Sequence, residues 1–166
     1  TLVIGQAQTA AGDIAFVGFN ADNNDQFTII TTNYLEDGTQ IYFVDAGWTG
    51  TAIYASEGGI LWTVPSGGLP TNTMVTFTGA GAGGFTTFPT GSLEVGASVT
   101  AGTIAASGIA ASMALTTSGD QILAFTGSVA SPTFIAAANF NGAWSWTGTN
   151  NSEQSLLPPG LTSGTN

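Results

Sequence analysis

The sequence contains no lysine, arginine, histidine or cysteine in its 166 residues. An average globular domain is roughly 25% charged, with both signs present, whereas here Asp and Glu, 10 in all, carry the whole side-chain charge. The missing residue types exclude histidine general bases, lysine Schiff bases, thiolate nucleophiles and arginine clamps for phosphate. They also predict that nucleic acid is not a partner, because its binding depends on Lys and Arg neutralising phosphates.

Other absences concern the compartment and the surface. Without cysteine no disulfide can form, and no apolar run is long enough to span a bilayer, so we expect no membrane insertion. The chain begins at Thr1 rather than at a methionine, which we interpret as a processed, exported form, although a trimmed chain would look the same. Only 6% of residues are charged. A surface made mainly of Thr, Ser, Asn, Gln and Gly lacks the charge repulsion that normally prevents self-association.

The residues that are present form a β pattern. Runs rich in Val, Ile, Phe, Tyr, Trp and Thr alternate with Gly, Asn, Asp and Pro. These runs begin at Thr1, Asp13, Gln26, Thr39, Gly59, Asn72, Ser92, Ser112, Asp120 and Thr133. They predict an all-β fold, a two-sheet antiparallel β-sandwich of about ten strands with little or no helix.

Three local features refine this prediction. The turn Glu36-Asp37-Gly38 predicts that the runs before and after it form a hairpin. The Ala-rich stretch Thr103–Leu115 is the best candidate for a short helix, and Gly79–Gly84 is a loop that lacks the lysine of a phosphate cradle. The predicted core is Phe16, Ile29, Tyr42, Phe43, Trp62, Phe77, Ile122, Phe125 and Phe134.

The same pattern divides the chain into three parts. Residues 1–11 form an N-terminal strand, 12–157 the β-sandwich domain, and 158–166 a C-terminal tail. The tail begins at Pro158-Pro159-Gly160, where the strand pattern ends.

The loop Asn20–Asp25 is the first candidate site. Its alternating Asp and Asn oxygens suit a hard cation such as Ca²⁺, and a chain without basic residues has few other ways to neutralise clustered carboxylates. The loop lacks the glycine and the closing glutamate of an EF-hand, and its side chains could instead bond to their own backbone in a plain turn. The candidate ligands are Asp22, Asn24, Asp25, Asp45 and Glu57.

Two other kinds of site remain open. A pair of carboxylates drawn from Asp13, Asp45, Glu57 and Asp120 could hydrolyse glycosidic bonds, but their spacing selects no pair and they could equally be solvated or cap turns. Trp144 and Trp146 alternate so that both indoles share one side of a strand. If exposed they could stack on sugar rings, and if buried they belong to the core or to an interface.

A possible modification site lies close to the tryptophans. Asn150-Asn151-Ser152 has the form of an N-glycosylation sequon. Glycans are therefore a possible attachment at Asn150 as well as a possible ligand of the tryptophans.

Several motifs in a fixed order resemble a β-sandwich module of large secreted bacterial proteins, including cyanobacterial ones. The motifs are GDIAFVGFNADNNDQF at Gly12–Phe27, IYFVDAGW at Ile41–Trp48, EGGILWTVPSGGLP at Glu57–Pro70, SGDQILAFTG at Ser118–Gly127 and SLLPPGLTSGTN at Ser155–Asn166. In such proteins the module accompanies nuclease-like domains, calcium-binding repeats or sorting signals. The resemblance implies an extracellular, non-catalytic module with an adhesive or structural role.

The chain departs from that module at both ends. The module retains basic residues and continues for another strand after its LPPGLT segment, whereas this chain has neither and carries TLVIGQAQT at its start. Leu2, Val3 and Ile4 make this terminal strand apolar, which is a liability unless the strand is paired. It either pairs within its own sandwich or is donated to a neighbouring subunit.

Taken together, the sequence predicts a secreted structural protein without enzymatic activity. We expect a self-assembling homopolymer, the subunit of an extracellular fibre, sheath or surface layer, formed by N-terminal strand donation. The alternative is a Ca²⁺-dependent carbohydrate-binding or adhesion module.

Overall fold

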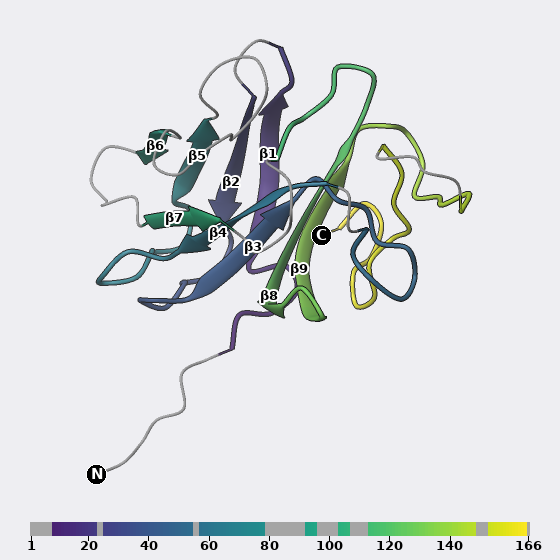
Figure 1. The fold of residues 1–166 in the computed structure, drawn as a ribbon. Coiled ribbons are helices and arrows are strands. Elements are labelled where there is room, and N and C mark those ends of the chain that lie inside the picture. The colour runs from purple at the N-terminus through teal and green to yellow at the C-terminus, as the bar shows by residue number, and fades with distance from the viewer. Residues whose placement is uncertain are drawn as a thin grey trace.

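The computed structural model describes residues 8–22, 25–54, 57–78, 92–95, 103–106, 113–148 and 153–165, with only the backbone described in 92–95 and 103–106. Two antiparallel sheets face one another across a core (Figure 1). The strands of the described residues are β1 Ile14–Asn20, β2 Gln26–Thr31, β3 Gln40–Val44, β4 Gly59–Thr63, β5 Met74–Thr78, β6 Ser92–Val95, β7 Thr103–Ala106, β8 Gln121–Ser128 and β9 Ser131–Asn139.

The order of the strands places β1 and β9 on the same side of the molecule. One sheet has the order β1-β2-β5-β6 and the other β7-β4-β3-β8-β9, and all neighbouring strands run antiparallel. The edge strands β1 and β9 also contact one another across the gap between the sheets. The predicted antiparallel β-sandwich is therefore confirmed. Among the described residues there is no apolar helix of the length that a membrane crossing needs.

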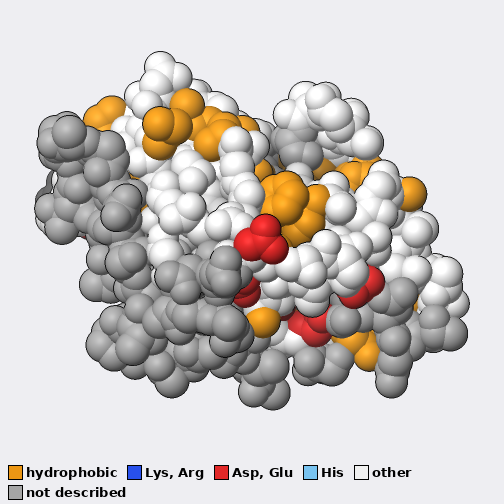
Figure 2. Space-filling view, turned by 90° about the horizontal axis from the view of Figure 1, so that it is seen from above, with side chains coloured by type: hydrophobic (Ala, Val, Ile, Leu, Met, Phe, Trp, Pro, Cys, Tyr) orange, Lys and Arg blue, Asp and Glu red, His pale blue; other side chains and the backbone are white. Residues whose placement is uncertain are grey.

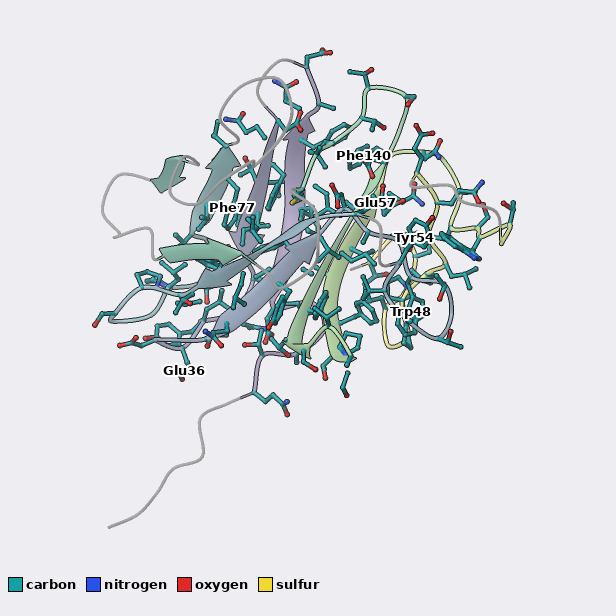
Figure 3. The ribbon with its side chains drawn as sticks, in the orientation of Figure 1. Glu36, Trp48, Tyr54, Glu57, Phe77 and Phe140 are labelled. Atoms are coloured by element: carbon teal, nitrogen blue, oxygen red, sulfur yellow. The ribbon has the colours of Figure 1, made fainter. Side chains whose placement is uncertain are left out.

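The core between the sheets follows from the period-two alternation of the strands. In β2 the buried Phe27 alternates with half-exposed neighbours, and its ring stacks on that of Phe77, its partner in the register with β5, at 4.6 Å between centroids. Phe43 of the opposite sheet lies 5.1 Å from Phe27 and 4.9 Å from Phe77. Figure 3 places Phe77 inside the sandwich. Aromatic rings from three strands thus fill the centre of the core.

The outer face of the second sheet is also covered, by loops rather than by strands. Val44, Leu123 and Phe125 of β3 and β8 form a second cluster with Ile53 and Leu161 from two loops. The first five residues of β8 are consequently all buried, a continuous apolar pattern that a strand covered on both faces requires. Leu161, which lies after the Pro-Pro-Gly sequence, packs into this cluster with 8% of its surface exposed.

The predicted core residues occupy the inside of the fold. Phe16 and Tyr42 are half-buried and pack against the two clusters. The others have less than 5% of their surface exposed: Ile29, Phe43, Trp62, Phe77, Ile122, Phe125 and Phe134.

The hairpin prediction at Asp37-Gly38 is wrong, although the turn itself is present. Thr39 donates to the carbonyl of Glu36 at 3.1 Å, and Gly38 has φ +74°, a conformation that favours glycine. However, β2 pairs with β1 and β5, while β3 pairs with β4 and β8. The turn therefore carries the chain from one sheet to the other, because the two flanking runs bury their apolar faces against each other instead of sharing an edge.

Two further expectations need correction or fall outside the description. Of the Ala-rich helix candidate Thr103–Leu115, residues Thr103–Ala106 form a strand, β7, that pairs with β4, and residues 107–112 lie outside the described residues. The run expected as a strand from Ser112 contains none over its described residues 113–118. Of the predicted N-terminal strand at 1–11, residues 8–11 form no strand, and residues 1–7 lie outside the described residues.

Candidate functional site

Three aspartates are buried at one end of the sandwich. Asp25 directly precedes β2, Asp45 directly follows β3, and Asp120 directly precedes β8. The exposed fractions of these residues are 4%, 3% and 2%. Because β3 and β8 run antiparallel, with Val44 opposite Leu123, the residue after one strand and the residues before the other meet at the same end.

These carboxylates accept hydrogen bonds from three consecutive backbone amides. Ala114 N donates to Asp45 Oδ2 at 2.5 Å. Leu115 N donates to Asp25 Oδ2 at 2.8 Å, and Thr116 N donates to Asp120 Oδ2 at 3.0 Å. This explains why the segment is not a strand. Its amides are satisfied by side-chain oxygens, so they do not need a neighbouring strand.

Further donors surround the remaining carboxylate oxygens. Gly58 N donates to Asp45 Oδ1 at 2.8 Å. The backbone amide of Gln121 donates to Asp120 Oδ1 at 2.8 Å, and its side-chain Nε2 donates to the same oxygen at 3.1 Å and to the backbone carbonyl of Asp45. Buried polar groups thus satisfy one another in a network that joins the ends of β3 and β8 to the 114–116 segment.

Burial changes the acidity of all three groups. It raises the pKa of Asp45 to about 7 and that of Asp120 to about 8, because an ionised carboxylate is costly to desolvate. The amide hydrogen bonds act in the opposite direction, and repulsion between neighbouring carboxylates adds to the rise. Burial also raises the pKa of Asp25, against the bond from Leu115. The chain has no basic side chain to neutralise them.

The predicted calcium ligands are only partly brought together. Asp25 and Asp45 are close enough to interact electrostatically. Asp22 is exposed, and its backbone amide donates to Asn20 Oδ1 at 2.8 Å, which is the turn bond of the alternative interpretation. Asn24 lies outside the described residues, and Glu57 is half-buried next to Gly58. No group of three or more acidic side chains in the described ranges has the arrangement of a metal site.

The four carboxylates considered for glycoside hydrolysis do not gather in one place. Asp45 and Asp120 share the buried network described above, and Glu57 directly precedes Gly58, whose backbone amide donates to Asp45. Asp13 lies at the other end of the β1–β2 pair, where Oδ2 accepts from Ala10 N at 2.6 Å and Oδ1 from Asn33 Nδ2 at 2.8 Å.

The tryptophans predicted as glycan contacts have different surroundings. Trp144 is half-buried and packs against the second cluster. Trp146 is also half-buried, and its ring centroid lies 5.2 Å from that of Tyr54. Tyr54 and Trp48 lie in the loop region beside the second sheet (Figure 3). Asn150, like the assembly residues Leu2, Val3 and Ile4, lies outside the described residues.

The edge strand β1 carries a feature that the sequence did not predict. A β-bulge between Phe16 and Gly18 inserts one residue, so Phe16 stands opposite Ile29 and Phe19 stands opposite Phe27. Both partners are fully buried, so Phe19 as well as Phe16 lies on the side of β1 that faces the other sheet. Phe19 nevertheless keeps 53% of its surface exposed, and the bulged Val17 keeps 52%.

An apolar groove of about 260 Å³ opens beside this edge. Phe16, Val17 and Phe19 form one wall, and residues of β8 and β9 form the other. The rings of Phe19 and Phe140 stack at 3.8 Å between centroids. Seen from above, the surface shows patches of hydrophobic side chains beside acidic groups, and the chain has no basic side chains (Figure 2). We call the groove the β1–β9 groove. Its lining residues are Phe16, Val17, Gly18, Phe19, Ile122, Ala138, Asn139 and Phe140.

The sequence did contain a signal for the bulge. In a regular strand two phenylalanines three residues apart point to opposite faces. Phe16 and Phe19 flank Val17-Gly18, and a glycine inside a strand often marks a bulge. Comparisons with family models, with curated proteins and with solved structures found no match to this chain.

Proposed function

We propose that the chain is a non-catalytic structural subunit that self-assembles into an extracellular fibre, sheath or surface layer. The observation that carries this proposal is the exposed edge of β1, where Val17 and Phe19 are each about half exposed beside an apolar groove. Monomeric proteins usually protect such an edge with charges, prolines or a covering segment. In the described residues β1 pairs only with β2, and the strand contains no charged residue.

The charge composition supports association through the backbone. Side-chain salt bridges between copies are impossible without lysine, arginine or histidine. Pairing at a strand edge needs none, because main-chain hydrogen bonds and apolar side chains supply the contact. The formal net charge of −10 opposes association, but salt screens exposed carboxylates over distances beyond about 10 Å.

The absence of catalysis in this proposal follows from the donor groups at the carboxylates. Asp25, Asp45 and Asp120 accept bonds from backbone amides that hold the 114–116 segment, which is a structural role. The extracellular location rests on the resemblance to modules of secreted bacterial proteins, and the lack of cysteine is compatible with it.

Assembly is tested with the purified full chain by sedimentation velocity and electron microscopy over a range of concentrations. We expect polymers that disappear in Val17→Asp, because a charge on an edge strand opposes pairing. Met74→Asp is the matched control, since Met74 is 53% exposed and lies on β5, away from the groove. A wild-type chain that stays monomeric at every concentration would overturn the proposal.

A second candidate is a carbohydrate-binding or adhesion module that depends on Ca²⁺. The half-buried ring pair Tyr54 and Trp146 favours it, because indole and phenol rings stack on sugars. Binding to a set of polysaccharides, followed by tryptophan fluorescence, tests this function. Trp146→Ala should abolish the binding while Trp62→Phe, in the core, should retain it.

A further inference from the structure

We propose that the β1–β9 groove is the acceptor for residues 1–9 of a second copy of this chain, with Leu2 and Ile4 seated between the two sheets. This inference rests on the proposed self-assembly and adds to it the surface and the occupant. Three features support it: the shape of the groove, the edge of β1 that no described strand pairs with, and the place where the chain enters the sandwich.

The groove is an opening into the side of the core. Phe16 and Phe19 come from one sheet, and Ile122 and Ala138, which pair with each other, come from the second. The stacked rings of Phe19 and Phe140 border it. An occupant must therefore be apolar and extended, so that it presents side chains to both walls while its backbone runs along an edge.

The outer edge of β1 supplies backbone amide and carbonyl groups with which an extended segment could pair. A strand pairs on two sides, and β1 uses one side for β2 over Ile14–Asn20. A donated strand would take the outer side, as in other cases of strand addition to an open edge. Seven β1 residues span about 20 Å at the usual rise per residue, which matches the reach of a short donated segment.

The N-terminal segment has the chemistry that the groove requires. Leu2-Val3-Ile4 is an apolar run without charge or proline, followed by small and uncharged polar residues. In an extended segment Leu2 and Ile4 share one face. A cavity of about 150 Å³ suffices for benzene, so a groove of about 260 Å³ has room for two aliphatic side chains.

The entry point of the chain favours a second copy over the same copy. Gly12 N donates to the carbonyl of Ile135 in β9 at 2.8 Å, and Thr9 is buried, so these residues are fixed against the sandwich. The described part of the chain starts at the end of the sandwich where β1 begins (Figure 1), whereas Phe140 lies toward the opposite end (Figure 3). The chain would have to reverse at Gln8 to reach its own groove. Donation to the next copy is head-to-tail and propagates as a filament.

Single cysteines test the contact cleanly, because the chain has none. A full-length chain carrying Leu2→Cys, Val3→Cys or Ile4→Cys is mixed with one carrying Val17→Cys, assembled and oxidised. We expect a disulfide between the two different chains for at least one of the three positions. Met74→Cys replaces Val17→Cys in the control, and it should give no such product because it is equally exposed but remote from the groove.

The outcomes separate the two proposals. Polymers without any cross-link to Val17→Cys would overturn the groove as acceptor and leave self-assembly standing. A chain that never polymerises would overturn self-assembly itself. One chain carrying both Val3→Cys and Val17→Cys, oxidised at high dilution, decides the occupant. A monomer closed by an internal disulfide would show that the segment fills its own groove, whereas polymers linked between chains support the second copy.

Discussion

Phe19 of β1 stacks on Phe140, the residue that follows β9, with ring centroids 3.8 Å apart and planes 12° from parallel. One ring comes from the edge strand of the first sheet and the other directly follows the edge strand of the second, so their contact joins the two sheets. One ring is half exposed and the other half buried. The stack therefore borders the groove at the edge of the core.

Replacing Phe140 by alanine should loosen this edge. We expect the free energy of unfolding to fall by about 1–2 kcal/mol, because an aromatic pair contributes ~0.5–1.5 kcal/mol beyond its buried area and Phe140 is only half-buried. Urea unfolding of the monomer measures the change. Phe140→Leu, which keeps most of the apolar area but not the ring stack, should lose less. An unchanged midpoint in Phe140→Ala would mean that the stack contributes nothing to stability.

The buried aspartates predict that stability falls as the pH rises. The native pKa values of about 7 for Asp45 and about 8 for Asp120 lie above the ordinary value of 3.8, so the native state binds more protons than the unfolded state between these limits. Their contribution is complete below about pH 3.8 and is lost as the pH rises through 7 and 8. Unfolding free energies measured by urea titration at a series of pH values test this.

Asp120→Asn provides the control for that pH dependence. The amide keeps one acceptor oxygen but cannot ionise, so the fall between about pH 7 and pH 9 should become shallower. Asp37→Asn, which removes an exposed carboxylate outside the buried network, is the matched substitution for comparison. A wild-type chain that becomes more stable toward alkaline pH would contradict the assignment of raised pKa values.

Calcium should stabilise the chain only where the carboxylates are ionised. We predict that millimolar Ca²⁺ raises the melting temperature relative to EDTA more at about pH 9 than at about pH 5, because a ligand bound to the native state stabilises it and Asp45, with a pKa of about 7, binds metal only when it is ionised. Asp25→Asn should reduce the difference. Superimposable melting curves in EDTA and Ca²⁺ at alkaline pH would leave the Asn20–Asp25 loop as an ordinary turn.

Gly47 should be the least replaceable glycine of the second cluster's loops. A Cβ atom built at Gly47 would lie 1.9 Å from the backbone carbonyl oxygen of Gln154, so even alanine must displace the 153–161 segment. We expect Gly47→Ala to lower the free energy of unfolding by about 1–3 kcal/mol. Gly18→Ala is the control, because nothing lies within 4 Å of its Cβ position. If urea titration gives the two variants equal free energies of unfolding, the 153–161 segment can move to accept the Cβ atom without loss of stability.

Local patterns in the sequence identified most of the strands. The alternation in QFTIIT and the short apolar run in GILWT required only the neighbouring residues, and both form strands as predicted. Phe43, Trp62 and Phe77 could be placed in the core for the same reason, because large apolar side chains on a strand bury one face.

Interactions between residues far apart in the chain account for the differences between the predicted and the observed structure. No local signal at Asp37-Gly38 indicates that β2 and β3 belong to opposite sheets, because this depends on which distant strands pair with each of them. Leu115 and its neighbours have a strand-like composition, yet their amides bond to aspartates up to 90 positions away. The sequence identified Asp25, Asp45 and Asp120 as candidate site residues. It did not predict that they are buried or that all three accept hydrogen bonds from the 114–116 segment.

The sequence by itself determined that this protein has no basic side chain, builds its structure from strands and has a surface poor in charge. These properties follow from residue types and from their period of two along the chain. Only the tertiary structure decided that Asp25, Asp45 and Asp120 share one buried network and that Phe19 turns toward Phe140 beside an open edge. Such arrangements depend on strand register and on contacts between segments far apart in the chain, which no local pattern encodes. They also depend on one inserted residue in β1, for which the sequence offers only the local signal of Gly18.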